Sequence, residues 1–427
     1  MKKLLLITLL FPLLADAQTN ADSAKYQSTI KYYTKAITQN PKDAGYYYKR
    51  GMAQYGLEDY KAALADLNQS IALDAKNEEA FIDRGRTYDN LKDYKNAMAD
   101  YSSAIALVPK DAVAFYNRGL AKAHLEDYKG ALSDYNQAII FNPKDADAFN
   151  ERGICKKHLE DYKGAIADYT QAIVLNPQDS YPYFNRGLLK NTLKDYKGAI
   201  ADFDQTVILN PKHADAWYSR AGVKRTLEDY RGAVDDYTKY IMLEPKDPDG
   251  YNGRGLAKLG LDDFIGAKDD DNKAIALDPK YSAAYYNRGL ANDGINDYSE
   301  AIDDYTTYIT LNPKDADGYF KRGNTKLDLE DYKSAIDDYN LTLSIDPQYS
   351  NAYYNRALVK RKLEDYKGAI DDYTKVITLE PKNDDAYNNR GYAKHLLNDN
   401  TGACADFNKA VSMGNKLAPE NITNFCK

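Results

Sequence analysis

Arginine and aspartate recur along this chain at a fixed spacing. Arg152 is followed by Asp168, and the same two residue types return 34 residues later as Arg186 and Asp202. Eleven such pairs occur in the sequence. In an antiparallel pair of helices the two positions come near each other, so each pair is expected to be a partly buried ion pair. Because a catalyst does not need eleven copies of one site, we interpret the pairs as structural groups that fix helix register.

The other groups with possible chemistry do not complete a site. His124 and His158 lie one repeat apart, and two ligands do not close a metal site, so we interpret them as exposed polar residues. The run Asp269-Asp270-Asp271 lacks the spaced ligand loop of calcium sites and is interpreted as part of a solvated, weakened helix. The sequence holds no phosphate loop, zinc-protease motif or nucleophile elbow. It therefore predicts a protein that is not an enzyme, with no catalytic residues, no metal and no cofactor.

Composition excludes several classes of protein. With 3 cysteines and 4 histidines among 427 residues, the chain is neither a disulfide-rich miniprotein nor a multi-zinc protein. It carries 57 basic and 64 acidic side chains, a net charge of −7, whereas nucleic-acid binders normally carry a basic excess. We therefore expect no nucleic-acid partner. A hydrophobic content of 44% also excludes wholesale disorder.

The first 17 residues have the pattern of an export signal. Two lysines precede the apolar run from Leu4 to Leu14, and Ala15-Asp16-Ala17 fits a small-x-small cleavage site. The run is too short to span a bilayer, and no later segment is apolar enough to do so. We expect a cleaved signal peptide at 1–17, no membrane span, and a bacterial protein that is periplasmic or secreted.

The rest of the chain is built from one repeated unit. A half repeat at 18–43 precedes eleven tandem repeats of 34 residues at 44–417, and a capping segment follows at 418–427. The repeats begin at Ala44, Glu78, Ala112, Ala146, Ser180, Ala214, Pro248, Ser282, Ala316, Ser350 and Asp384. Such a period indicates a solenoid of stacked structural units.

Within each repeat the pattern predicts two helices. Position 20 is always alanine and position 8 is glycine in nine repeats, which permits close helix approach. Position 16 is always aspartate, a good N-cap for the second helix. Position 32 is proline in nine repeats and ends that helix. The result is an antiparallel helix pair whose apolar faces need a neighbouring pair.

The chain resembles the tetratricopeptide repeat family. The spacing of Trp217, Ala221, Ala233, Tyr237 and Pro245 matches the family pattern, and the resemblance covers residues 44–417 and the half repeat. It implies an all-α fold, a right-handed α/α superhelical solenoid of antiparallel helix pairs. It also implies that the first helices line a concave groove that holds partner proteins or peptides.

The seventh repeat departs from this pattern. Asp271 replaces the aromatic residue at position 24, and Lys268 replaces the apolar residue at position 21. We expect this repeat to pack poorly and to form a soft spot or a bend.

The resemblance also places residues in the groove. Positions 5, 6 and 9 carry aromatic, asparagine and aliphatic residues, which suit partner anchoring and backbone hydrogen bonds. The alternative is that these side chains pack between repeats. The candidate groove residues are Tyr116, Asn117, Leu120, Phe184, Asn185, Leu188, Tyr218, Tyr286, Asn287, Leu290, Phe320, Tyr354 and Asn355.

The groove lacks the carboxylate clamp with which some family members hold acidic chaperone tails. That clamp needs lysine at position 5, which is never lysine here, whereas position 2 is often acidic, as at Glu79 and Asp147. An acidic tail would be repelled, so a basic or neutral partner segment is expected.

Cys404 and Cys426 lie close to the end of the chain, where a capping helix is expected over the last repeat. In an oxidising compartment a disulfide between them would hold that cap, stabilising it by roughly 3 kcal/mol. Two unrelated thiols are the alternative. Cys155, at position 10, is expected to be a small buried residue.

Taken together, these features predict a non-catalytic protein–protein interaction scaffold that binds partner proteins or peptides in its concave groove. The alternative is a self-assembling envelope protein that stacks through its solenoid ends.

Overall fold

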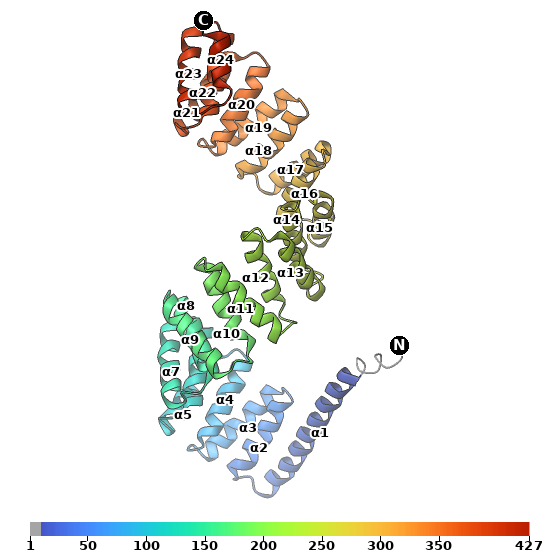
Figure 1. The fold of residues 1–427 in the computed structure, drawn as a ribbon. Coiled ribbons are helices and arrows are strands. Elements are labelled where there is room, and N and C mark those ends of the chain that lie inside the picture. The colour runs from blue at the N-terminus through green and yellow to red at the C-terminus, as the bar shows by residue number, and fades with distance from the viewer. Residues whose placement is uncertain (1–9, 427) are drawn as a thin grey trace. The chain divides into compact units, whose positions relative to one another are not determined.

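The computed structural model describes residues 10–426, with side chains from Asp22 onward. All regular secondary structure in this range is α-helical, which confirms the all-α prediction (Figure 1). The chain divides after Pro211 into two compact units. They are called the N-terminal unit and the C-terminal unit below.

The N-terminal unit consists of one long helix followed by five helix pairs (Figure 1). Its helices are α1 (Leu10–Gln39), α2 (Ala44–Gly56), α3 (Tyr60–Leu73), α4 (Glu78–Asn90), α5 (Tyr94–Leu107), α6 (Ala112–His124), α7 (Tyr128–Phe141), α8 (Ala146–His158), α9 (Tyr162–Leu175), α10 (Ser180–Thr192) and α11 (Tyr196–Leu209).

The C-terminal unit consists of six helix pairs and a short last helix. Its helices are α12 (Ala214–Thr226), α13 (Tyr230–Leu243), α14 (Pro248–Leu259), α15 (Phe264–Leu277), α16 (Ser282–Gly294), α17 (Tyr298–Leu311), α18 (Ala316–Asp328), α19 (Tyr332–Ile345), α20 (Ser350–Lys362), α21 (Tyr366–Leu379), α22 (Asp384–Leu396), α23 (Asn400–Ser412) and α24 (Ala418–Phe425).

The first helix of every pair begins at the residue with which the corresponding sequence repeat begins. The predicted signal peptide lies outside the described residues, apart from residues 10–17, which belong to α1. Within residues 10–426 no helix combines the length and apolar character needed to cross a membrane.

The turn inside each pair is set by two consecutive residues. At position 15 the backbone is left-handed in all eleven repeats, although none of these residues is glycine; Glu160, for example, has φ of 62°. The next residue is the predicted N-cap, and Asp161 accepts a hydrogen bond from the backbone N–H of Gly164 at 2.9 Å. Ten of the eleven position-16 aspartates cap in this way, and Asp297 is the exception. The caps confirm the prediction made from the sequence.

The core of most pairs is an aromatic ring set against a glycine. The Tyr169 ring is fully buried, and a Cβ on Gly153 would lie 2.7 Å from its Cε1 atom. Any side chain at this glycine would therefore push the ring and the second helix away. The position-20 alanines are also fully buried, so small residues on both helices allow the close approach.

Helix α24 covers the last helix pair. Its Ala418 is fully buried, and the Phe425 ring stacks on His395 with 4.1 Å between ring centroids. The structure also joins Cys404 on α23 to Cys426 in a disulfide with a Cα–Cα distance of 5.7 Å. The C-terminal end of the stack therefore presents a closed surface.

Candidate partner-binding groove

The predicted Arg–Asp pairs form in every repeat. Arg152 on α8 donates from Nε to Oδ2 of Asp168 on α9 at 2.8 Å, and from Nη2 to Oδ1 at 2.6 Å. The same two-pronged contact occurs in all eleven repeats. The aspartate is buried in each case, so the predicted partly buried ion pairs are confirmed, and their role in fixing helix register stays an interpretation.

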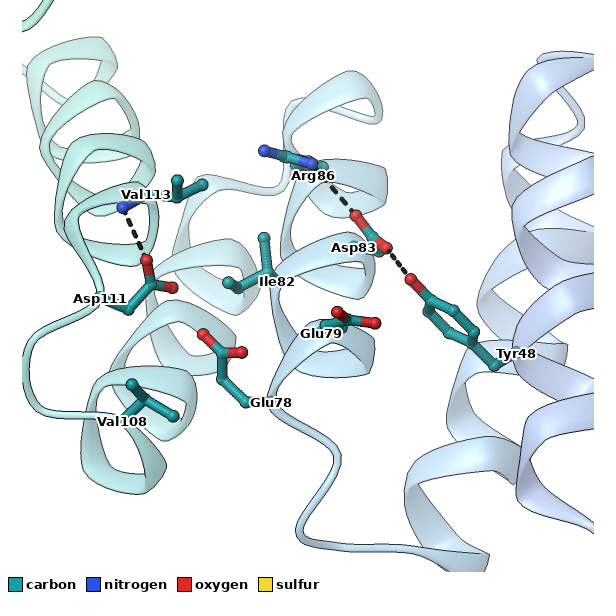
Figure 2. A pocket seen from close by; sticks show the side chains of 9 residues that line it. All are labelled: Tyr48, Glu78, Glu79, Ile82, Asp83, Arg86, Val108, Asp111 and Val113. Atoms are coloured by element: carbon teal, nitrogen blue, oxygen red, sulfur yellow. Dashed lines mark hydrogen bonds and ion pairs between the residues drawn. The ribbon is translucent and has the colours of Figure 1, made fainter. Parts of the chain in front are cut away.

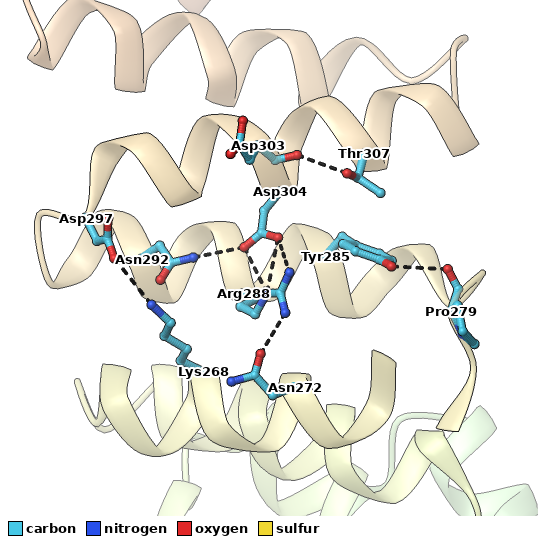
Figure 3. Close-up of polar contacts among 10 residues, drawn as sticks. All are labelled: Lys268, Asn272, Pro279, Tyr285, Arg288, Asn292, Asp297, Asp303, Asp304 and Thr307. Carbon is cyan, nitrogen blue, oxygen red and sulfur yellow. Dashed lines mark hydrogen bonds and ion pairs between the residues drawn. The ribbon is translucent and has the colours of Figure 1, made fainter. Parts of the chain in front are cut away.

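The same arginine links consecutive repeats. Nη1 of Arg152 donates to Oδ1 of Asn136 on α7, the second helix of the preceding pair, at 2.9 Å. Figure 3 shows the equivalent contact in the C-terminal unit, where Arg288 lies between Asn272 on α15 and Asp304 on α17. One side chain therefore fixes both the pairing inside a repeat and the stacking on its neighbour.

A lysine completes most of these contacts, and it was missed in the sequence analysis. Nζ of Lys156 lies 2.7 Å from Oδ2 of Asp168, and eight of the eleven repeats carry lysine at this position, 11. The signal was present, because these lysines follow the arginines by four residues and share their helix face.

Two of the repeats without this lysine have a buried aspartate with a raised pKa. In the repeat with Asp304, Asn292 replaces the lysine and donates to the carboxylate at 2.9 Å (Figure 3). Burial raises the pKa of Asp304 above its usual value, against the lowering effect of Arg288. Burial likewise raises the pKa of Asp100, whose repeat carries Tyr88 in place of lysine. Each of these two carboxylates has an arginine beside it and no lysine.

The predicted groove aromatics pack on the second helix of their own repeat. Tyr116 contacts Tyr135 with 5.8 Å between ring centroids, and Tyr218 lies between Tyr237 and Tyr240. Most of these rings are half-buried, and Phe320 is only 8% exposed. The equivalent contacts are made by Phe184, Tyr286, Phe320 and Tyr354. Each ring thus offers an edge rather than a whole face to a partner.

The predicted groove asparagines serve mainly to join repeats. Asn185 donates to Oδ1 of Asn150 at 3.0 Å, and Asn355 donates to Oδ1 of Asn324 at 2.8 Å, in both cases in the preceding repeat. Asn117 and Asn287 are buried. The aliphatic candidates Leu120, Leu188 and Leu290 are half-buried. Asn185 and Asn355 are therefore engaged within the chain, whereas the buried Nδ2 of Asn117 has no hydrogen-bond partner.

The first helices of the N-terminal unit form a pocket of about 530 Å³. It is lined by Tyr48, Glu78, Glu79, Ile82, Asp83, Arg86, Val108, Asp111 and Val113 (Figure 2). Its lining combines three aliphatic residues with four carboxylates and one guanidinium. That guanidinium, on Arg86, pairs with Asp83 at 3.2 Å, and Asp83 also accepts from the Tyr48 hydroxyl at 2.7 Å.

The carboxylates of this pocket disfavour any further negative charge. A hydrogen bond to Asp111, together with burial, raises the pKa of Glu78 to about 7. Glu78 is therefore only partly ionised at neutral pH.

A second pocket of about 440 Å³ repeats this arrangement two repeats further along the chain. It is lined by Tyr116, Asp147, Asn150, Glu151, Ile154, Asp179, Tyr181 and Asn185. Its carboxylates occupy the repeat positions of Glu79, Asp83 and Asp111 in the first pocket, and none of its lining residues is a cation. Burial raises the pKa of both Asp147 and Glu151. Tyr116 and Asn185 are the two sequence candidates that the structure brings together here.

The C-terminal unit has a pocket of different chemistry. Its volume is about 390 Å³, and Leu256, Leu259 and Leu290 line it together with Arg225, Thr226, Tyr230 and Gly260. Arg225 is the single charged residue of this lining. Another pocket of this unit, of about 600 Å³, is lined by Glu380, Pro381, Lys382, Asn383, Asp384 and Asp385, so acidic linings occur in both units.

The interpretation of Asp269-Asp270-Asp271 as a solvated run was wrong for two of its residues. Asp270 forms the ion pair of its repeat, and Asp271 is completely buried in the place of the core ring. Burial raises the pKa of Asp271 to about 8, and its Oδ1 accepts a hydrogen bond from Asn252 at 3.2 Å. Lys268 reaches Asp297 at 3.4 Å, close to the aspartate that does not cap its helix (Figure 3).

The two histidines and the cysteine considered in the sequence analysis make packing contacts within the fold. His124 and His158 are exposed and stack on Tyr94 and Tyr128, and Cys155 is buried with its thiol pKa raised to about 12 by burial. Among residues 10–426 no group of three or more His, Cys, Asp or Glu side chains is arranged to hold a metal ion.

Comparison with protein families gives matches along nearly the whole chain. Three models described as tetratricopeptide repeat match it, one at 146–179 and 350–383, a second at 14–80, 82–146 and 184–251, and a third at 282–315, 316–349 and 384–413. No curated protein matches the chain.

Among solved structures, similarity is found to YrrB, described as a tetratricopeptide repeat protein with an unusual peptide-binding site, at 23% identity and a TM-score of 0.39, over 44% of this chain and 97% of that one. Similarity is also found to pilF of Pseudomonas aeruginosa, at 18% identity and a TM-score of 0.44, over 48% of this chain and 94% of that one. For yeast Tom70 the identity is 17% and the TM-score 0.41, over 96% of this chain and 93% of that one.

Proposed function

Since the chain belongs to the tetratricopeptide repeat family, whose members are typically non-catalytic scaffolds for proteins or peptides, we propose that it binds a basic partner segment along the first helices of its N-terminal unit. The observation that carries this proposal is the pair of acidic pockets, each with at least one aliphatic side chain in its lining. The occupant is a lysine- or arginine-containing segment with apolar residues beside the basic ones.

Charge selects this occupant. The second pocket holds three carboxylates and no cation among its lining residues, so a basic side chain entering it gains hydrogen bonds to ionised acceptors. The aliphatic stem of lysine or arginine fits against Ile154 while the charged end reaches the carboxylates. An acidic segment would meet like charge and be rejected.

The test uses the full chain and two fluorescein-labelled peptides, one alternating lysine with isoleucine and one alternating glutamate with isoleucine. We expect anisotropy to show binding of the lysine peptide alone. The double variant Asp147→Asn/Glu151→Gln keeps the shape of the pocket and removes its charge, so the dissociation constant should rise about tenfold or more.

The matched control is Glu126→Gln/Glu160→Gln, which removes the same charge from two exposed turns. It should leave the affinity unchanged apart from a small salt-sensitive shift. Equal losses in both double variants, or binding of both peptides alike, would refute the pocket as the binding site. A pull-down with the full chain, repeated with the pocket variant, then identifies the natural partner.

Binding should also depend on pH in one direction. The pKa of Glu78 is raised to about 7, and burial raises the pKa values of Asp147 and Glu151 above their usual range, so these groups release protons as the pH rises. A cation binds the ionised form, so affinity for the lysine peptide should increase between about pH 5.5 and about pH 8.5. The opposite trend would contradict the assignment.

We further propose that this binding takes place after export, in the periplasm or outside the cell. The leader pattern at 1–17 and the Cys404–Cys426 disulfide support this location. Mass spectrometry of the native protein should find Gln18 at the start of the chain and the two cysteines cross-linked without reductant. A chain that starts at Met1 with both thiols free would exclude export.

Stacking through the solenoid ends receives less support. Helix α24 and its disulfide close the C-terminal end of the last helix pair. A fibre needs two open ends, so this end would have to uncap before chains could stack.

A further inference from the structure

Arg225, in the last turn of α12, is a half-buried arginine without a partner of opposite charge. The eleven arginines of the repeated ion pairs each lie against an aspartate. Arg361 has the same repeat position as Arg225, and its Cζ atom lies 5.3 Å from the centroid of the Tyr392 ring. The residue that corresponds to Tyr392 beside Arg225 is Leu256. In the part of the chain that the structure describes, Arg225 therefore has neither a carboxylate nor an aromatic face as its partner.

The contacts of this guanidinium do not neutralise its charge. Its Nε atom is buried and has no hydrogen-bond partner among the described residues. Burial raises the pKa of Tyr237, while the charge of Arg225 and a hydrogen bond with it have the opposite effect. The Tyr237 hydroxyl is thus a neutral contact at physiological pH. A buried N–H without an acceptor and a charge without a counter-charge both cost free energy, which a bound anion would recover.

Arg225 belongs to the pocket of about 390 Å³ in the C-terminal unit. Three leucines line this pocket with it, Leu256 and Leu259 on α14 and Leu290 on α16, and all three are half-buried. Half-buried leucines gain free energy when an aliphatic molecule removes their remaining surface from water. The lining therefore combines one cationic group with aliphatic side chains.

We propose that this pocket binds a small aliphatic monocarboxylate, with its carboxylate on Arg225 and its hydrocarbon chain on the three leucines. A carboxylate fits a guanidinium through two parallel hydrogen bonds, and Nε is one of the donors available for them. The site shares no lining residue with the acidic pockets of the N-terminal unit and takes a ligand of opposite charge.

Size and charge both favour a small molecule with one carboxylate. The volume of the pocket lies near the lower end of the roughly 300–1,000 Å³ that is usual for small-molecule sites. The chain has a net charge of −7, so a segment with several acidic residues would be repelled. A monocarboxylate brings a single negative charge, which Arg225 neutralises.

Isothermal titration calorimetry of the full chain with sodium octanoate tests the proposal. We expect one site with a dissociation constant of the order of 0.1–1 mM, which suits a ligand of about ten non-hydrogen atoms. Octanamide has the same chain without the charge and should bind at least about tenfold more weakly. Equal binding of octanoate and octanamide would overturn the proposal.

Variants of Arg225 assign the binding to this residue. Arg225→Gln should raise the dissociation constant for octanoate at least about tenfold, and Arg225→Lys should keep part of the affinity because it retains the charge without the paired donors. The matched control is Arg361→Gln, the same change at the same repeat position, which should leave the affinity unchanged. Circular dichroism checks that each variant is folded. Unchanged affinity in Arg225→Gln, or an equal loss in Arg361→Gln, would contradict the assignment.

A labelling experiment locates the ligand without changing Arg225. Thr226 lines the pocket, whereas Thr192 has the same repeat position outside it, and both are exposed and donate to a backbone carbonyl four residues earlier. The cysteines of the chain itself are buried or disulfide-bonded. At ten times its dissociation constant, octanoate should slow the alkylation of Thr226→Cys by iodoacetamide up to about tenfold and leave Thr192→Cys unaffected. Protection of both variants, or of neither, would place the ligand elsewhere.

The free carboxyl end of a polypeptide is the competing occupant. A short peptide that ends in leucine, with a free or an amidated terminus, distinguishes it from a small molecule. We expect both forms to bind more weakly than octanoate. If the free form bound more than about tenfold more tightly than octanoate, and lost this affinity in Arg225→Gln, the assignment to a small molecule would be wrong.

Discussion

In the N-terminal unit Arg152 and Lys156 hold Asp168, and in the C-terminal unit Arg356 and Lys360 hold Asp372 in the same way. The Nη2–Oδ1 distance is 2.6 Å in both. The exposed surfaces of the two units differ, although both units share these ion-pair contacts. On the exposed face of the second helices, position 22 is serine or alanine in the first five repeats and aspartate in the next five. The pocket around Glu151 is acidic, whereas the pocket around Arg225 is lined mainly by apolar residues.

This difference separates two kinds of residue. The ion pairs, ring–glycine contacts and N-caps repeat because every pair needs the same register and the same close approach. The positions that point away from these contacts vary without cost to the frame, since exposed side chains contribute little to folding. Function in a solenoid of this kind is therefore carried by the varying positions, and each unit presents its own surface.

The largest expected effect tests whether the buried ion pairs contribute equally to stability in the two units. Asp168→Ala and Asp372→Ala each leave an arginine and a lysine without their shared carboxylate, which should lower the free energy of unfolding by about 3–5 kcal/mol. Guanidinium denaturation should give the same loss in both units within about 1 kcal/mol. The control, Asp161→Ala, removes only an N-cap and should cost about 1 kcal/mol. A much smaller loss in one unit would show that its frame relies on other contacts.

A second, smaller effect should appear in the C-terminal unit alone. Because the pKa of Asp271 is raised to about 8, the folded chain keeps a proton that the unfolded chain releases near pH 4. This contribution to stability is complete below about pH 4 and is lost as the pH rises toward 8. Amide hydrogen exchange of α15, corrected for intrinsic rates, should therefore show weaker protection at about pH 8.5 than at about pH 5.

Asp271→Asn is the matched variant for this measurement, because it keeps the size of the side chain and cannot ionise. Its protection should be almost independent of pH, while α9 in the N-terminal unit should behave alike in both proteins. A pH dependence that persists in the variant would assign it to another group.

The smallest expected effect concerns the left-handed turns that both units share. Glu160→Gly and Glu364→Gly should each remove the steric cost of a Cβ at positive φ. Glycine also adds entropy to the unfolded chain, so the net increase in the free energy of unfolding should be up to about 1 kcal/mol. Thermal unfolding should show equal gains in the two units. Glu160→Ala retains the Cβ and should show no gain.

The fold could be predicted from the sequence to an unusual depth because a strict period repeats each signal eleven times. The Asp161 cap, the buried Ala165 and the Arg152–Asp168 pair all follow from residue type and spacing. The lysine at position 11 was predictable on the same grounds, since it lies one helical turn after the arginine. Asp271 was misread because a run of three acids looks solvated in sequence, whereas its helix directs one of them into the core.

The sequence by itself thus determined the helix pairs, their caps and their register, because these depend on local spacing and on contacts that recur within one repeat length. The tertiary structure alone decided which side chains remain open to a partner. Tyr116 packs on a ring of its own repeat, and Asn185 hydrogen-bonds to the preceding repeat. Glu151 lines a pocket, and Val174 is exposed. Exposure depends on how neighbouring pairs stack, and that information is spread over residues far apart in the sequence.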